Sequence, residues 1–172
     1  MYYTPLLITL PKPKIADITV NVSDGDNPIS GATVTIGDDE ETTDEDGDAT
    51  FESVYEGSTN ISVTASGYAD KTVTVTVDDS HTSFTVELEV VETITITVDD
   101  GEDTPTAIEG ASVKIGSTTK TTDSNGQCTF PGMTYDDYSA EVSAEGYTTA
   151  TESISFRSNH KSFTISLTAS GG

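Results

Sequence analysis

The chain has 172 residues, of which 30 are Asp or Glu and only 7 are Lys or Arg, so its formal net charge at pH 7 is −23. Such a surface repels nucleic acid and anionic membranes, so we expect neither as a binding partner. No apolar run is long enough to span a bilayer. The charge balance is typical both of proteins from salt-loving organisms and of acidic extracellular modules, and composition does not separate these two classes.

Residues 1–16 stand apart from the rest of the pattern, and we expect them to form an extended N-terminal docking arm. The prolines at positions 5, 11 and 13 exclude a helix. No basic residue precedes the apolar run, as one would in an export signal. We expect the arm to bind a partner, the alternative being that it folds back over its own domain. The expected contact residues are Leu6, Leu7, Ile8, Leu10, Lys12 and Lys14.

After the arm, one sequence pattern occurs twice. Residues 31–37 read G-A-T-V-T-I-G, and residues 110–116 read G-A-S-V-K-I-G. Each copy continues at the same distance with Thr-Thr-Asp, a Gly and Thr-Phe. A period of about 79 residues, with about a third of the aligned positions identical, indicates two copies of one domain. We expect the first repeat to cover residues 17–91 and the second to cover residues 92–172.

Each copy predicts about seven short strands and no helix. Apolar residues alternate with Thr or Asn over residues 18–22 and 94–98, which is typical of a half-buried strand. A hairpin is expected between the strands around residues 34–36 and 49–51, with its turn at residues 44–47, and likewise at residues 123–126. Glu152 replaces Val73 in the second copy, which predicts an exposed edge strand there. The first-repeat residues expected to line the core are Ile18, Val20, Val22, Val34, Ile36, Ala49, Phe51, Ile61, Val63, Val75, Val77, Phe84, Val86 and Leu88.

The fold class that follows is all-β, with two tandem β-sandwich domains. The connection over residues 88–93 contains neither Gly nor Pro. We therefore expect the two domains to form a stiff rod rather than beads on a flexible linker.

The order G-A-x-V-x-I-G, then T-T-D-x-x-G-x-x-T-F, then A-x-G-Y, resembles the carboxypeptidase regulatory-like, or transthyretin-like, superfamily. This resemblance implies seven-stranded Ig-like sandwiches that serve as spacers and interaction modules and are not catalytic. The chain is also similar to collagen-adhesin B-type repeats, whose self-formed Lys–Asn bond needs a Lys on the first strand. Neither residues 18–22 nor residues 94–98 contain Lys, so we do not expect that bond.

Few residues suggest catalysis, and we expect the chain not to be an enzyme. His81 and His160 occupy the same hairpin position in different domains, so we expect turn roles rather than a shared site. Cys128 has no possible disulfide partner in the chain. We expect it to be a buried free thiol, the alternative being a reactive or intermolecular one.

The acidic turn at Asp44, Asp46 and Asp48 is the candidate metal site. Carboxylates around a Gly are typical of hard-cation loops, but the spacing does not fit an EF-hand. In the second copy the same positions are Asp123, Asn125 and Gln127. We expect a solvated turn without a cofactor, weak binding of Ca²⁺ or another cation being the alternative.

The second copy has an aromatic and acidic cluster, Tyr135-Asp136-Asp137-Tyr138, where the first has Glu56, Gly57, Ser58 and Thr59. Such a cluster could contact a partner, a host surface glycan included. Packing of the tyrosines within their own loop is the simpler interpretation.

The expectation for function is a structural protein of a virus particle: a capsid decoration, turret or tail accessory, held by its arm and assembling with itself and with other capsid or tail proteins. The absence of an export signal in a chain with extracellular-type domains favours this virion location. The alternative is a module of a cell-surface or secreted adhesin or appendage.

Overall fold

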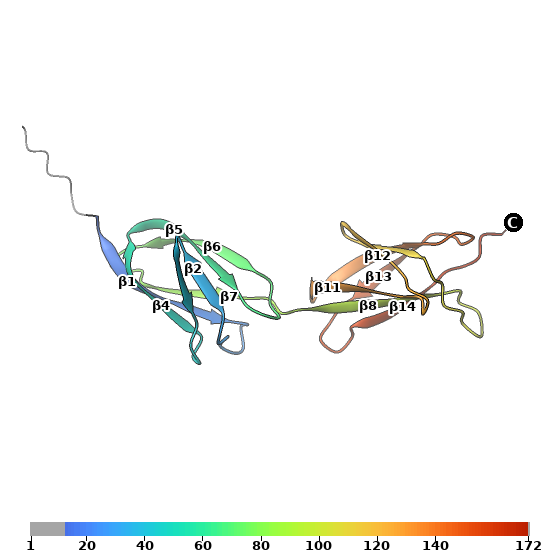
Figure 1. Cartoon of the computed structure of the whole chain (residues 1–172), viewed down its shortest axis with the longest axis horizontal. Helices are drawn as coiled ribbons and strands as arrows, with labels where there is room; N and C mark the ends of the chain where they lie inside the picture. The colour runs from blue at the N-terminus through green and yellow to red at the C-terminus, as the bar shows by residue number, and fades with distance from the viewer. Residues whose placement is uncertain (1–12, 172) are drawn as a thin grey trace, which may run out of the picture. The chain divides into compact units, whose positions relative to one another are not determined.

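The computed structural model describes residues 13–171, which form two compact units. The first unit comprises residues 13–66 and 70–88, and the second comprises residues 67–69 and 89–171. Each unit contains seven β-strands (Figure 1). The described residues contain no helix, and hence none that could cross a membrane. The predicted all-β fold of two tandem seven-stranded sandwiches is confirmed. Residues 1–12 of the expected arm lie outside the described residues.

The first unit consists of two facing sheets. Its strands are β1 (Ile15–Ser23), β2 (Thr33–Ile36), β3 (Asp39–Thr42), β4 (Asp48–Tyr55), β5 (Gly57–Thr64), β6 (Lys71–Val77) and β7 (Ser83–Glu87). One sheet has the order β4-β1-β7, and the other has the order β3-β2-β5-β6. Strand β7 runs parallel to β1, and the other neighbours are antiparallel.

The second unit repeats this topology. Its strands are β8 (Val91–Asp99), β9 (Ser112–Ile115), β10 (Thr118–Thr121), β11 (Gln127–Thr134), β12 (Asp137–Ser143), β13 (Ala150–Ser155) and β14 (Ser162–Ser166). The sheets have the orders β11-β8-β14 and β10-β9-β12-β13. Strand β13 lies at a sheet edge with Glu152 opposite Ala140, which confirms the edge expected from the sequence.

The core of each unit lies between its two sheets, where the alternating apolar residues meet. Val20, Val34 and Ile61 are fully buried, as are their counterparts Ile96, Val113 and Ala140. Most of the expected core is confirmed, but Val75 and Phe84 are only half-buried. Strands β6 and β7 are at sheet edges, where inward side chains are covered on one side only.

The expected hairpin between residues 34–36 and 49–51 is wrong. Strand β2 pairs with β3 and β5, whereas β4 pairs with β1 in the other sheet. The turn at residues 44–47 therefore carries the chain from one sheet to the other. The sequence concealed β3, because all four of its residues are exposed and it has no apolar alternation. Residues 123–126 make the same crossing in the second unit.

The crossing turn needs glycine for two reasons. Gly47 has a positive φ of 79°, and its amide donates a hydrogen bond to the Asp44 carbonyl at 3.1 Å. A Cβ at this position would lie 2.5 Å from the carbonyl oxygen of Val22, which is backbone and cannot move aside cheaply. Gly126 meets Val98 in the same way at 2.5 Å. Both glycines thus permit the close approach of the turn to the first strand.

We predict that Gly47→Ala lowers the free energy of unfolding of the first unit by about 3 kcal/mol, through backbone strain and overpacking. Gly31→Ala is the matched control, because Gly31 also has a positive φ, 77°, but no atom lies within 4 Å of its Cβ position. Gly31→Ala should lower the free energy of unfolding by about 1 kcal/mol, because only the backbone conformation opposes the alanine. Urea unfolding of the full chain, with hydrogen exchange to assign the unit, measures both. Equal losses would contradict the close-approach argument.

A β-bulge interrupts the pairing of β1 with β4. The register shifts between Ala16 and Ile18, and Ser53 takes a φ of 58°, which makes it the one non-glycine residue of the described chain with positive φ. Gly132 occupies the same position of the second unit, with φ 72°. The Ser53 amide donates to the Asp17 carboxylate at 2.8 Å, which holds the bulge in place.

Ser53→Gly should therefore stabilise the first unit by about 0.5 to 1 kcal/mol, because glycine adopts this conformation without strain. The reciprocal change Gly132→Ser should destabilise the second unit by a similar amount. Thermal unfolding of the two full-length variants beside the wild type provides the comparison. Destabilisation by Ser53→Gly would show that the bulge is not strained.

Candidate functional site

The acidic turn of the first unit uses its carboxylates to hold its own backbone. Oδ1 of Asp44 accepts hydrogen bonds from the amides of Asp46 at 2.9 Å and Asp48 at 3.0 Å. Asp48 in turn accepts from the side-chain amide of Asn21 at 2.8 Å. Within residues 13–171, no three His, Cys, Asp or Glu side chains are grouped so that they could hold a metal ion. Cation binding here stays a prediction.

The second unit builds the same turn with fewer charges. Asp123 accepts from the amides of Asn125 at 2.8 Å and Gln127 at 2.9 Å. Hydrogen bonds from these amides lower the pKa of the Asp123 carboxyl, and the bond from Gln127 has the larger effect. Asp44 and Asp123 therefore hold the backbone of the equivalent turn in the two units.

The tyrosine cluster of the second unit packs mainly against its own domain. The Tyr135 ring lies 5.2 Å from that of Phe156, and its hydroxyl donates to Glu92 at 3.3 Å. The Tyr138 hydroxyl donates to the carbonyl of Thr134 at 2.9 Å. Asp136 and Asp137 are exposed, and Asp137 pairs with Arg157 at 2.8 Å. The two carboxylates, rather than the tyrosines, are available to a partner.

Each histidine closes a turn between two strands. Nδ1 of His81 lies 2.9 Å from the Asp78 carboxylate, which also accepts from the Ser80 hydroxyl at 2.6 Å. Because hydroxyl and imidazole both bind the same carboxylate, this trio is a turn rather than a relay from nucleophile to base. In the second unit the His160 amide donates to the Arg157 carbonyl at 3.0 Å, and the centre of its ring lies 4.3 Å from that of the tilted Phe163 ring. The expected turn roles are confirmed.

Cys128 is a free thiol with 7 % exposure, as expected. Burial, reinforced by the charge of Asp123, raises the pKa of this thiol. A thiol of this kind is a poor nucleophile near neutral pH.

Ion pairs clamp the beginning of the first strand in each unit. Lys14 lies 3.5 Å from Glu56 and 3.2 Å from Asp79. In the second unit Lys161 contacts Glu92 at 2.5 Å, which raises the pKa of the lysine and lowers that of the carboxyl. Of the expected arm contacts, Lys14 is thus part of the folded unit. Leu6, Leu7, Ile8, Leu10 and Lys12 lie outside the described residues.

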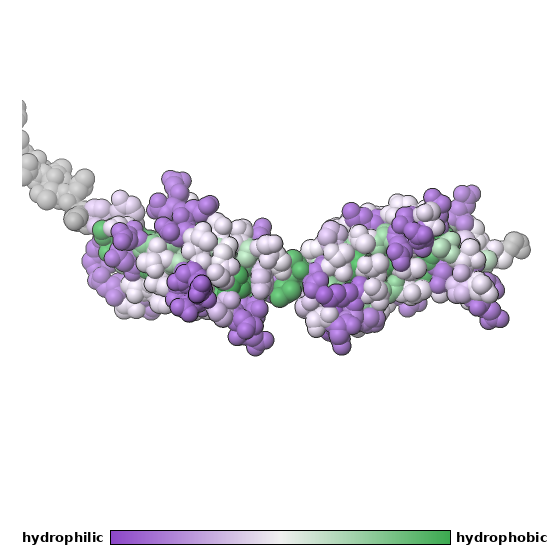
Figure 2. Space-filling model, turned by 60° about the horizontal axis from the view of Figure 1, so that its bottom comes forward, coloured by the Kyte–Doolittle hydropathy of each residue, from purple (hydrophilic) through white to green (hydrophobic). Residues whose placement is uncertain are grey.

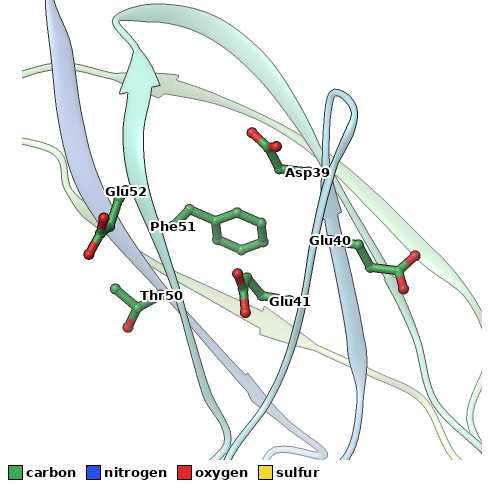
Figure 3. A pocket seen from close by; sticks show the side chains of 6 residues that line it. All are labelled: Asp39, Glu40, Glu41, Thr50, Phe51 and Glu52. Atoms are coloured by element: carbon green, nitrogen blue, oxygen red, sulfur yellow. The ribbon is translucent and has the colours of Figure 1, made fainter.

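The first unit has an open groove between the edge strands β3 and β4, which the sequence analysis missed. One cavity of about 400 Å³ is lined by Asp39, Glu40, Glu41, Thr50, Phe51 and Glu52 (Figure 3). A second of about 440 Å³ adjoins it at Asp39 and extends to Tyr55 and Glu56. The signal available in the sequence was the contrast between the acidic residues 38–41 and residues 117–120, which read S-T-T-K.

A model of the carboxypeptidase regulatory-like domain matches residues 17–90 and again residues 93–168. The chain therefore belongs to this family and contains two of its domains in tandem, as the sequence motifs suggested. No curated protein matches the chain.

Three solved structures are similar in fold. The shaft pilin SpaA of Lactobacillus rhamnosus GG is 16 % identical, with a TM-score of 0.44 and coverage of 92 % of this chain and 99 % of the pilin. The minor pilin of Streptococcus agalactiae is 15 % identical, with a TM-score of 0.45 and coverage of 90 % and 97 %. The TIE protein of Bacillus anthracis is 16 % identical, with a TM-score of 0.43. The match covers 90 % of this chain but only 34 % of the TIE protein. Such values do not establish function.

The Asp78 turn should make the stability of the first unit depend on pH. Hydrogen bonds from Ser80 and His81 hold the pKa of the Asp78 carboxyl well below its usual range. The stability that this carboxylate contributes is therefore present above about pH 4 and is lost as the pH falls through its depressed pKa. Asp78→Asn should lower the melting temperature at pH 6, and its difference from the wild type should shrink steadily as the pH falls from about 4 to about 2.

Glu45→Gln is the control, because it removes the same charge from a residue that is exposed. It should produce no comparable difference at either pH. Calorimetry of the three full-length proteins across this range measures the effect. A constant difference between Asp78→Asn and the wild type would contradict the assignment.

Proposed function

We propose that this chain is a non-enzymatic structural and interaction module of an extracellular protein assembly, placed in a cell-surface or secreted appendage. The observation that carries the proposal is that the motif residues repeated in both units all serve the scaffold. Thr43, Asp44 and Gly47 fix the crossing turn, and Thr122, Asp123 and Gly126 do the same in the second unit. A catalytic domain instead requires reactive groups that converge.

Surface chemistry supports an exposed, soluble role. Hydrophilic side chains dominate the visible face of each unit (Figure 2), in keeping with the net charge of −23. High net charge keeps a protein soluble and opposes unspecific association. Contacts with neighbours must then come from particular segments rather than from the general surface.

The proposed contact segment is the N-terminal arm, with Leu6, Leu7, Ile8, Leu10 and Lys12. Neighbours of the chain in the assembly would be further copies of itself and other structural proteins. Asp136 and Asp137 form a second proposed contact surface, with glycan as one candidate ligand. Weak cation binding at Asp44, Asp46 and Asp48, in the crossing turn of the first unit, is a separate proposal.

The virion placement expected from the sequence is the second candidate. No contact, cavity or charge of the described residues favours it. The two placements share the same structural role and differ only in the assembly that carries the chain.

Antibodies against the folded chain, applied to intact cells that carry the gene and to particles released from them, provide the test. We expect gold labelling on the cell surface or on appendages in electron micrographs. Permeabilised cells are the control for internal antigen. Labelling restricted to virus particles would replace the cell-surface placement with the virion, and labelling restricted to permeabilised cells would contradict both.

A further inference from the structure

In the groove of the first unit, two sheet edges leave an open surface with both apolar and acidic residues. Strands β3 and β4 belong to different sheets, and each is an edge strand. Their backbone groups on the groove side are therefore available to pair with an added strand. The two adjoining cavities, of about 400 and 440 Å³, run along β4 toward its end at Tyr55.

Strand register decides which carboxylates face this groove. Glu41 lies opposite Val34, and Asp39 lies opposite Ile36, so both side chains project to the side of the core. Glu40 lies opposite Thr35 and projects outward. Figure 3 shows Asp39 and Glu41 on either side of the Phe51 ring, with Glu40 directed away. The groove therefore combines an aromatic wall with two inward carboxylates.

At the end of the groove beside the start of β1, two large apolar side chains are exposed. Tyr55 is 67 % exposed and Ile15 is 43 % exposed, and the two lie opposite each other in the pairing of β1 with β4. Beside them, Oε1 of Glu56 is buried without a hydrogen-bond partner among the described residues. A buried carboxylate oxygen is costly unless a donor reaches it. Lys14 pairs with the other oxygen of Glu56. An apolar segment that brings one hydrogen-bond donor would therefore cover Ile15 and Tyr55 and supply the partner that Oε1 lacks.

The second unit lacks these features at the same repeat positions. Lys120 stands where the first unit has Glu41, and Thr134 stands where it has Tyr55. Tyr135 replaces Glu56 and packs on Phe156. The acidic, apolar groove is thus particular to the first unit and is not required by the fold.

We infer that this groove binds residues 6–12 of a second copy of the chain as an added strand, an inference that deepens the proposed role of the arm. Leu6, Ile8 and Leu10 alternate as a strand requires, and Lys12 brings a positive charge to the inward carboxylates. These seven residues span about 23 Å when extended, which is close to the length of the eight-residue strand β4 beside the groove.

The occupant comes from another copy rather than from the same chain. The arm leaves the folded unit at Lys14, whose carbonyl accepts from the amide of Glu56 at the very mouth of the groove. Pro11 and Pro13 favour extended backbone on both sides of Lys12. Strand β1 runs antiparallel to β4 and begins beside its end at Tyr55, so the chain before Ile15 leads away from the groove of its own unit.

The test measures self-association of the full chain by light scattering over a range of concentrations at 0.15 M and 1 M salt. Glu41→Lys should weaken association about tenfold, because it replaces an attractive contact with Lys12 by repulsion. The fold accepts lysine here, since the second unit has Lys120 at this position. Glu40→Lys, on the outward face, is the matched control. It reduces the magnitude of the negative net charge by the same amount as Glu41→Lys, so it should associate like the wild type or slightly more strongly.

Charge exchange makes the test specific. Lys12→Glu should weaken association as Glu41→Lys does, and the double variant with both changes should recover at least half of the wild-type association. A wild type that is monomeric at every concentration overturns the inference, as does an absence of recovery in the double variant. If Glu41→Lys associates normally but deletion of residues 1–12 abolishes association, the groove is wrong and the proposed arm function stands. If neither change matters, both fail.

Discussion

The buried hydroxyl of Thr43, repeated as Thr122, is the interaction on which each unit depends. It donates to the carbonyl of Ile29 at 2.7 Å and accepts from the amide of Ala32 at 2.9 Å, although the residue is only 4 % exposed. The backbone of Thr43 also bonds Gly31 and Ala32, so one residue ties the end of β3 to the loop before β2. Leaving such buried groups unpaired costs about 1 to 3 kcal/mol each. This tie fixes where the chain leaves one sheet, and the crossing turn at Gly47 then delivers β4 to the other.

Because the repeated residues are committed to this scaffold, differences between the copies identify the surfaces that are free for function. Two of these differences change charge and aromatic content together: residues 38–41 against 117–120 around the third strand of each unit, and residues 55–59 against 134–138 where the fourth strand ends. In the first unit both places border one groove, whereas in the second they contain a lysine and a packed pair of tyrosines. Two units with one fold therefore present different chemistry to a partner.

Periodicity predicted the sandwich fold and most of the core, because alternation such as Ile18, Val20 and Val22 follows directly from one buried face. It failed at β3, where polar residues form a strand through pairing alone, and hence assigned β4 to the wrong partner. Individual turn roles were also predictable, since Asp44 and Gly47 act on their own neighbours. The groove was not, because it depends on which strands are edges and on the register that turns Glu41 inward and Glu40 outward.

Inward carboxylates on an edge strand discourage pairing with most other strands and also select the kind of strand that can pair. Asp39 and Glu41 penalise any neutral strand that would pair with β3, since their charges would be buried without a partner. A strand that supplies a lysine removes this penalty, so the same residues that exclude most strands admit a cationic one. At a net charge of −23, with only seven basic residues in the chain, such strands are rare on the molecule itself. Lys120 reverses the charge at the equivalent edge of the second unit, which there would favour an acidic strand instead. The charge of one side chain thus decides which strands can bind at two edges with the same backbone structure.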